Sequence, residues 1–241
     1  MNGRRVVVLL AAVAAVALTA RLGLWQLDRA AQKTALQTAL DTRRALPPLM
    51  PGDLARDEAQ AAAQHHRATT LQGRWLDQYT LYLENRQMRG RPGFFVVTPM
   101  LLVDGTAVLV QRGWLPRDLM DRTKVQAPPL PGTAQSLVSG RIAPGPGRLY
   151  EFEGAASGVI RQNLALADFA QETGLRLRPF TLVQEEGPAK GQSVLSDGLL
   201  RDWPQPATGV AKHHGYAFQW FALSILILGL YVWFQLFRPR R

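Results

Sequence analysis

The chain has 241 residues, a formal net charge of +10 and no cysteine. The lack of cysteine excludes disulfides, a thiol nucleophile and thiolate metal sites. Much of the positive charge lies on arginines near the two ends, so the basic composition is weak evidence for nucleic-acid binding, and we expect no nucleic-acid partner.

The first predicted element is an apolar run over Val6–Leu27, which follows Arg4 and Arg5. The run is long enough to cross a bilayer if the helix continues past Arg21, whose side chain would then reach the interface. The same residues are also typical of a signal peptide with a cleavage site at Ala15–Ala17. We favour the uncleaved membrane anchor.

The next region, 28–66, is predicted to be a helical extension and linker. Asp28–Leu40 carries an apolar stripe at helical spacing, and prolines then break the pattern. Asp53–Gln64 is rich in Ala, Gln and charge, which indicates a short exposed helix or a mobile insertion.

Residues 67–212 are predicted to form a β-rich domain. Its expected strands are runs of β-branched and aromatic residues bounded by Gly, Pro and Asp: Thr69–Leu71, Tyr79–Leu83, Phe94–Thr98, Met100–Val103, Thr106–Gln111, Ser136–Ile142, Val159–Gln162 and Phe180–Gln184. Asp104-Gly105 predicts a hairpin with a type I′ turn. Ala165–Thr173 reads as a helix closed by Gly174.

The last element is an uncharged apolar run over Ala217–Phe237, followed by arginines in 238–241. Aromatic residues near both of its ends suit the two interfaces of a bilayer. With basic residues outside both runs, we expect tails at 1–5 and 238–241 in the cytoplasm, a first span at 6–27, and a membrane entry and second span at 213–237. The expected fold is therefore a mainly antiparallel β (α+β) domain, a small barrel or sandwich, flanked by two transmembrane helices.

Motifs of common enzymes are missing from the sequence. It has no glycine-rich phosphate loop, no Gly-x-Ser-x-Gly elbow and no His-Glu-x-x-His, so we expect no enzymatic activity.

Histidine occurs in two pairs. His65-His66 lies in a polar stretch and reads as a surface pair. His213-His214 lies just before Tyr216, at the membrane entry, where an imidazole either ligates haem iron or simply anchors the helix.

Four stretches of the chain, in order, resemble the Surfeit locus protein 1 family of cytochrome c oxidase assembly factors. They are Leu22–Arg29 with Lys33; Asn85-Arg86 with Gly90–Phe94 and Thr98-Pro99; Val108–Pro116; and His213 with Tyr216, Gln219 and Trp220. The third, which contains Arg112-Gly113-Trp114, is the most specific.

The resemblance implies a bacterial inner-membrane protein with a periplasmic domain, which assists delivery of haem a to oxidase subunit I. Its implied partners are subunit I, the haem a synthesis machinery and membrane lipid. His213 is similar in position to the proposed haem ligand of the family. His214 stands where the family usually has an aliphatic residue, so which of the two histidines would bind the iron stays open.

Other residues are placed at the same site by their position near the two membrane entries. Trp25, Tyr216 and Trp220 would wall a haem pocket, and Arg29, Arg21 or Lys212 would pair with the propionates. Interfacial anchoring is the alternative for each. Arg112-Gly113-Trp114 fits a structural corner better than a haem contact.

Two other functions stay open. One is an assembly scaffold that stabilises subunit I without binding haem. The other is a membrane-tethered periplasmic domain that serves a transporter or secretion complex.

Overall fold

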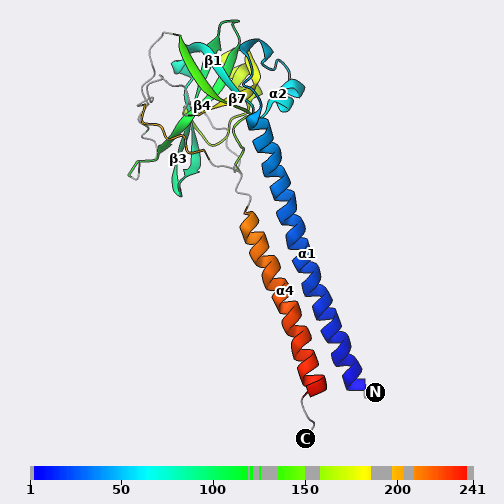
Figure 1. The fold of residues 1–241 in the computed structure, drawn as a ribbon. Helices are drawn as coiled ribbons and strands as arrows, with labels where there is room; N and C mark the ends of the chain where they lie inside the picture. Colours follow the sequence, from blue (N-terminus) through cyan, green and yellow to red (C-terminus); the bar gives the residue numbers. More distant parts are fainter. Residues whose placement is uncertain are drawn as a thin grey trace. The chain divides into compact units, whose positions relative to one another are not determined.

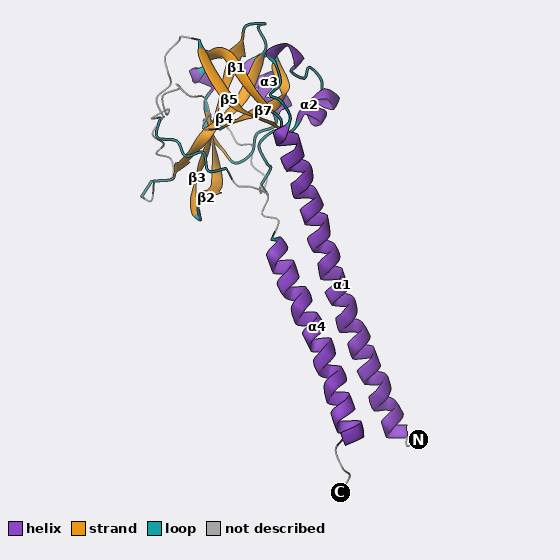
Figure 2. Cartoon of the chain, in the orientation of Figure 1, coloured by secondary structure: helices purple, strands orange, loops and turns teal. Residues whose placement is uncertain are grey.

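The computed structural model describes residues 3–118, 120–121, 125, 135–149, 158–185, 197–203 and 209–237. The predicted tail at 238–241 lies outside these residues. The chain forms two compact units, one of Met1–Asp41 with Pro206–Arg241 and one of Thr42–Gln205. The described part of the first unit is helical, and the strands belong to the second (Figures 1 and 2).

Two long helices make up the helical unit: α1 (Gly3–Ala45), apart from its last turn, and α4 (Val210–Val232), which continues as a π-helical turn (Trp233–Phe237). Both are long and apolar enough to cross a membrane, with mean hydropathies of 2.3 and 1.8 in their most apolar windows. They lie side by side and antiparallel, since residue 19 of α1 contacts residue 224 of α4 and residue 26 contacts residue 213 (Figure 1).

The helix α1 passes through Arg21 without a break and ends at Ala45, beyond the predicted limit at Leu40. Its 43 residues make it about 65 Å long, roughly twice the thickness of the hydrocarbon core of a bilayer. A span within α1 therefore leaves several turns of the same helix outside the membrane.

The second unit is a β-barrel. Five strands close into a ring in the order β1-β5-β7-β4-β3, and β3 pairs again with β1. The strands β2 and β6 extend the sheet from β3. The pairs β4–β7 and β2–β6 are parallel and the others are antiparallel. Of the two predicted architectures, the barrel is thus the one formed, and the mainly antiparallel character is confirmed.

Most strands run longer than the sequence pattern indicated, but β6 is shorter than predicted, and β3 joins two runs that were predicted as separate strands. Their bounds are β1 (Ala68–Trp75), β2 (Leu81–Met88), β3 (Arg91–Leu102), β4 (Ala107–Pro116), β5 (Ser136–Ala143), β6 (Ile160–Arg161) and β7 (Leu177–Gln184). The predicted helix near Ala165 is present as α3 (Leu166–Thr173), closed by Gly174 in the left-handed conformation. The first strand residue predicted for β2, Tyr79, instead ends a 3₁₀ turn (Asp77–Tyr79).

The β3–β4 hairpin is where predicted, but its turn is not type I′. Only Gly105 has a positive φ (75°), and its N–H donates to the carbonyl of Leu102. A turn over Leu102–Gly105 whose last residue is a left-handed glycine forms the three-residue loop with a G1 bulge. The type I′ geometry occurs at Arg89-Gly90, between β2 and β3, where both residues have positive φ.

The segment over 46–66 is not a mobile insertion, which corrects one of the two readings of Asp53–Gln64. It contains a 3₁₀ turn (Pro51–Asp53) and the short helix α2 (Glu58–Gln64), whose outer face is exposed as predicted. Leu49, Leu54, Ala55 and Ala61 are buried in the same apolar cluster as the barrel residues Met100 and Phe180. The segment therefore completes the barrel core.

A buried arginine ties this segment to the barrel. Arg178 of β7 donates to the carbonyl oxygens of Leu54 and Ala55, at 3.2 and 3.0 Å, and to the carboxylate of Asp104 at 2.6 Å. Asp104 also accepts from the hydroxyl and N–H of Thr106, and these bonds, followed by the Arg178 charge, lower its pKa to about 2. One side chain thus holds the linker and the β3–β4 turn together.

The lowered pKa of Asp104 predicts a small acid sensitivity. A carboxylate with a depressed folded-state pKa stabilises the fold above its ordinary pKa, and this contribution is lost as the pH falls toward 2. In Asp104→Asn, we expect the thermal midpoint of the barrel to fall less between pH 5 and pH 3 than in the wild type. Equal pH slopes in the two proteins would contradict the assignment.

The Arg112-Gly113-Trp114 stretch forms a structural corner, as the residue types predicted. The Trp114 ring is 1% exposed, and its Nε1 donates to the carbonyl of Arg86 at 2.8 Å. The guanidinium of Arg112 lies 5.4 Å from the centre of the Trp75 ring and pairs with Asp197. Gly93 of β3 packs so closely on Trp114 that a β-carbon there would overlap the indole ring.

Candidate functional site

The two long helices pack through small and polar residues. The hydroxyls of Thr19 and Ser224 are 2.6 Å apart, and a β-carbon on Gly23 would lie 2.8 Å from the ring of Phe221. Ala30 of α1 and Ala217 of α4 are buried as well. Small residues let two apolar helices approach closely, which is typical of helix pairs in membranes.

His213 continues the face of α4 that packs on α1. It precedes Ala217 by four residues and Ser224 by eleven, which is the spacing of one helix face. Its Nδ1 lies 2.7 Å from the amide oxygen Oε1 of Gln26. Because that oxygen only accepts, Nδ1 carries the proton, and Nε2 is left with a lone pair that can bind a metal.

The neighbouring histidine is placed differently. His214 is exposed, one residue and about 100° around the helix from His213. The sequence analysis left the choice between the two histidines open, and only His213 is held by a hydrogen bond to α1 within the described residues. A fixed ring orientation with one nitrogen held is the usual state of a metal-ligating histidine.

Cations of α1 lie close to His213. The ammonium of Lys33 is 3.8 Å from where a β-carbon of Gly209 would stand, and Gly209 caps the start of α4. The charges of Lys33 and Arg29 are near enough to act on the His213 ring. This end of the helix pair therefore combines an imidazole with positive charge, a combination that suits a metal ligand beside an anionic group.

The aromatic residues predicted for the site differ in how far they are exposed. Trp25 is 48% exposed and forms a cation–π contact with Arg29, whose guanidinium is 5.7 Å from the ring centre. Tyr216 is half-exposed, and Trp220 is partly buried.

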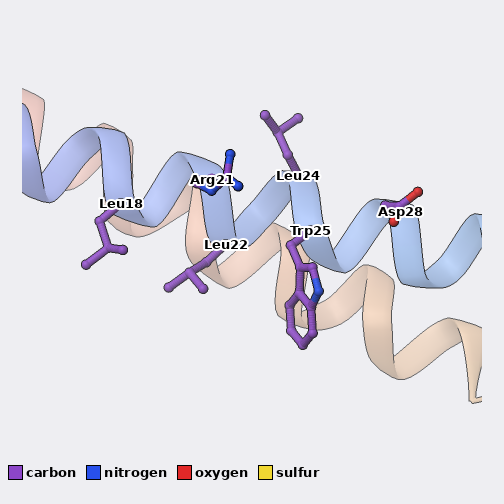
Figure 3. Close-up of a pocket in the computed structure, with 6 residues that line it drawn as sticks. All are labelled: Leu18, Arg21, Leu22, Leu24, Trp25 and Asp28. Atoms are coloured by element: carbon purple, nitrogen blue, oxygen red, sulfur yellow. The ribbon is translucent and has the colours of Figure 1, made fainter.

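A groove of about 580 Å³ runs along α1 beside Trp25. Leu18, Leu22 and Trp25 project from one side of the helix and Leu24 and Asp28 from the other, with Arg21 between them (Figure 3). His213 and Trp220 do not line this groove. The structure thus joins His213 with Gln26, and Trp25 with Arg29, as two neighbouring sets on the helix pair.

The environment of two side chains, Gln26 and His66, was missed from the sequence. The hydrogen bond of Gln26 to His213 joins residues 187 apart, and nothing local signals such a contact. His66 was read as a surface residue, but it is half-buried and lines a cavity of the barrel unit. Within the described residues no group of three or more His, Asp or Glu side chains is placed to hold a metal ion.

Fold and site together define a class of protein: a small β-barrel joined to two candidate membrane helices, with a histidine that is hydrogen-bonded between the helices. The chain belongs to the SURF1 family, whose model matches residues 13–225.

The chain is similar to several described proteins. It is 25% identical to a SURF1-like protein of Rickettsia felis over 218 residues, which covers 88% of this chain and 89% of the relative. A SURF1-like protein of Rickettsia conorii is also 25% identical, over 84% of its length. The cytochrome oxidase assembly protein SHY1 of Saccharomyces cerevisiae is 31% identical over 96 residues, which is 39% of this chain and 24% of SHY1.

Proposed function

We propose that this chain is a membrane-anchored assembly factor for cytochrome c oxidase, which holds haem a and delivers it to subunit I. Membership of the SURF1 family and the similarity to an oxidase assembly protein of yeast support the role in assembly. The observation that carries the haem-delivery part is the hydrogen bond between Gln26 and His213 at the start of α4.

The proposed cargo accounts for the chemistry of the site. Haem a is apolar with two anionic propionates, so transfer between membrane proteins favours a site near the bilayer surface. His213 Nε2 would hold the haem iron, and a single histidine ligand would bind haem while still allowing its release. Lys33 and Arg29 suit the propionates, and Trp25, Tyr216 and Trp220 suit the apolar ring. Holding and releasing haem requires no catalytic group.

The proposed topology follows the basic residues outside the two apolar runs. Both termini lie in the cytoplasm, α1 and α4 cross the inner membrane, and the barrel lies in the periplasm. The limits of the spans at 6–27 and 213–237 remain part of this proposal. The partners are oxidase subunit I, the machinery that makes haem a, and membrane lipid.

Deletion of the gene tests the assembly role. We expect membranes of the deletion strain to lose most of the oxidase absorbance and activity, while haem a synthase remains present. The full chain expressed in trans restores both. Normal oxidase levels in the deletion strain would contradict the assembly role. Loss of oxidase without any haem on the purified chain would favour the scaffold alternative.

Gln26→Leu tests the haem-delivery part. Loss of a partner that holds the ligating histidine is expected to weaken haem a binding about tenfold or more. Gln26→Glu keeps an acceptor for Nδ1–H and is expected to retain binding. Haem titration of the purified full chain, followed by absorbance, measures both. The control is Gln37→Leu, further along α1, where the amide donates to Asp41, and an equal loss in this control would contradict the role of Gln26.

A further inference from the structure

The groove on α1 lies on the face of that helix that points away from α4. Its walls within the described residues all belong to α1: Leu18, Arg21, Leu22, Leu24, Trp25 and Asp28 (Figure 3). At about 100° per residue, Arg21 and Asp28 lie roughly opposite Gly23, which packs on Phe221 of α4. On the proposed topology, in which α1 crosses the membrane, the groove therefore faces lipid.

Arg21 places an uncompensated positive charge in this groove. Its side chain is exposed, and no described residue forms a hydrogen bond or an ion pair with it. It lies within the apolar run, about 9 Å along the helix from the end of the run at Leu27. A charge inside a span is costly without a polar partner, and the long arginine side chain can reach the phosphate level of the bilayer. The position therefore favours an anionic group bound at Arg21.

The opposite charge lies at the outer end of the groove. Asp28 directly follows the apolar run, so it lies nearer to water than Arg21 whichever way the helix crosses. The two residues are two turns apart, on one face of the helix and separated by about 10.5 Å along its axis. They form no ion pair with each other. Oδ2 of Asp28 accepts from Gln32 at 2.8 Å, and no described residue donates to Oδ1.

The indole between the two charges is held in place. The guanidinium of Arg29 lies 5.7 Å from the centre of the Trp25 ring, and it donates to the amide oxygen of Gln32 at 3.1 Å. The nitrogen of the same amide donates to Asp28. Arg29 therefore contacts the ring and the amide rather than the carboxylate. This chain of contacts fixes the outer rim of the groove and leaves the carboxylate of Asp28 able to accept from a ligand.

We propose that the groove binds one phospholipid of the phosphatidylethanolamine class, whose headgroup carries both a phosphate and a primary ammonium. The guanidinium of Arg21 binds the phosphate, and the carboxylate of Asp28 accepts from the ammonium. The ammonium is joined to the lipid only through the phosphate, so it extends outward from Arg21 toward Asp28. The volume of about 580 Å³ lies in the range of small-molecule pockets, and the leucine side chains suit an acyl chain.

The charges of the groove disfavour other occupants. A second copy of the chain crosses the membrane in the same direction, so it would bring its own Arg21 to the same depth, where like charges repel. The headgroup of phosphatidylcholine has no N–H to donate to Asp28. Phosphatidylglycerol carries no positive charge to meet this carboxylate. The lipid that combines a phosphate with an ammonium therefore fits both ends of the groove.

Native mass spectrometry of the full chain in detergent tests the proposal. The chain is expressed without the enzymes of haem a synthesis, so the result does not depend on haem delivery. It is titrated separately with phosphatidylethanolamine, phosphatidylglycerol and phosphatidylcholine of identical acyl chains. Arg21→Gln removes the guanidinium, and Asp28→Asn removes the negative charge but keeps an acceptor for Gln32. The matched control is Arg43→Gln, at an exposed position near the end of α1 and outside the groove.

We expect the wild type to bind one phosphatidylethanolamine about fivefold or more tightly than either of the other two lipids. Arg21→Gln should weaken this binding by a similar factor, Asp28→Asn should abolish the preference over phosphatidylglycerol, and Arg43→Gln should change neither. Equal affinity for the three lipids, or wild-type affinity in Arg21→Gln, would overturn the proposal. Loss of a co-purifying oxidase subunit in Arg21→Gln with unchanged lipid binding would also overturn it and indicate a partner helix at Arg21.

Discussion

Cells that carry His213→Ala in place of the wild-type chain are expected to keep less than about a tenth of their cytochrome c oxidase activity. The variant removes the only imidazole that the described residues hold between α1 and α4, through the bond from Nδ1 to Gln26. On the proposed function, the variant removes the residue that would hold the haem iron. Oxygen consumption with reduced cytochrome c and the haem a content of membranes measure the effect.

His214→Ala is the matched control for this prediction. It removes the same group from the adjacent, exposed position and is expected to retain most of the oxidase activity. Immunoblots of the membranes must show equal amounts of both variants. Equal loss of activity in the two variants would show that the pair acts as an interfacial anchor, and full activity of His213→Ala would exclude it as ligand.

The second large effect is expected at Gly93. A β-carbon at this position would overlap the carbonyl oxygen of Leu115 and the indole of Trp114, and both are fixed by β4. Gly93→Ala is therefore expected to lower the free energy of unfolding of the barrel by about 3 kcal/mol or more. This is a large part of the roughly 5–15 kcal/mol that stabilises a typical domain.

Urea unfolding of the full chain in detergent, followed by tryptophan fluorescence, measures this loss. The control is Gly52→Ala, because a β-carbon on Gly52 meets nothing within 4 Å. We expect the control to unfold at the wild-type midpoint. An unchanged midpoint for Gly93→Ala would mean that β3 and β4 can separate locally, and would contradict the tight corner at Trp114.

The fold was predictable where the pattern is local. The strands and the helix before Gly174 follow from residue types and breakers, and the β3–β4 hairpin follows from Asp104-Gly105. The turn type was wrong because Gly105 serves a type I turn with a bulge as well as a type I′ turn. At Arg89-Gly90 the type I′ turn gave little signal, since arginine rarely adopts positive φ.

The core role of residues 46–66 could not be predicted. Leu49, Leu54, Ala55 and Ala61 are too widely spaced to give a periodic pattern, and alanine carries little signal of burial. They are buried because the segment packs on the barrel core, where Arg178 also binds the carbonyls of Leu54 and Ala55. That contact spans more than 120 residues and leaves no local trace in the sequence.

The candidate site was predictable as a region but not as an arrangement. The membrane entry and its histidine pair were visible, and spacing from Ala217 and Ser224 offered a means to separate His213 from His214. The partnership with Gln26 depends on how α1 and α4 pack, which no single helix encodes. The cavity at His66 depends on a backbone conformation that the polar sequence around it does not indicate.

The absorption spectrum of the wild-type chain tests the proposed function most directly. The full chain would be co-expressed with the enzymes of haem a synthesis, purified in detergent and measured in the reduced state. We predict haem a bands with close to one haem per chain, which disappear in His213→Ala and persist in His214→Ala. A wild-type chain free of haem that purifies with an oxidase subunit would contradict haem delivery and indicate the scaffold.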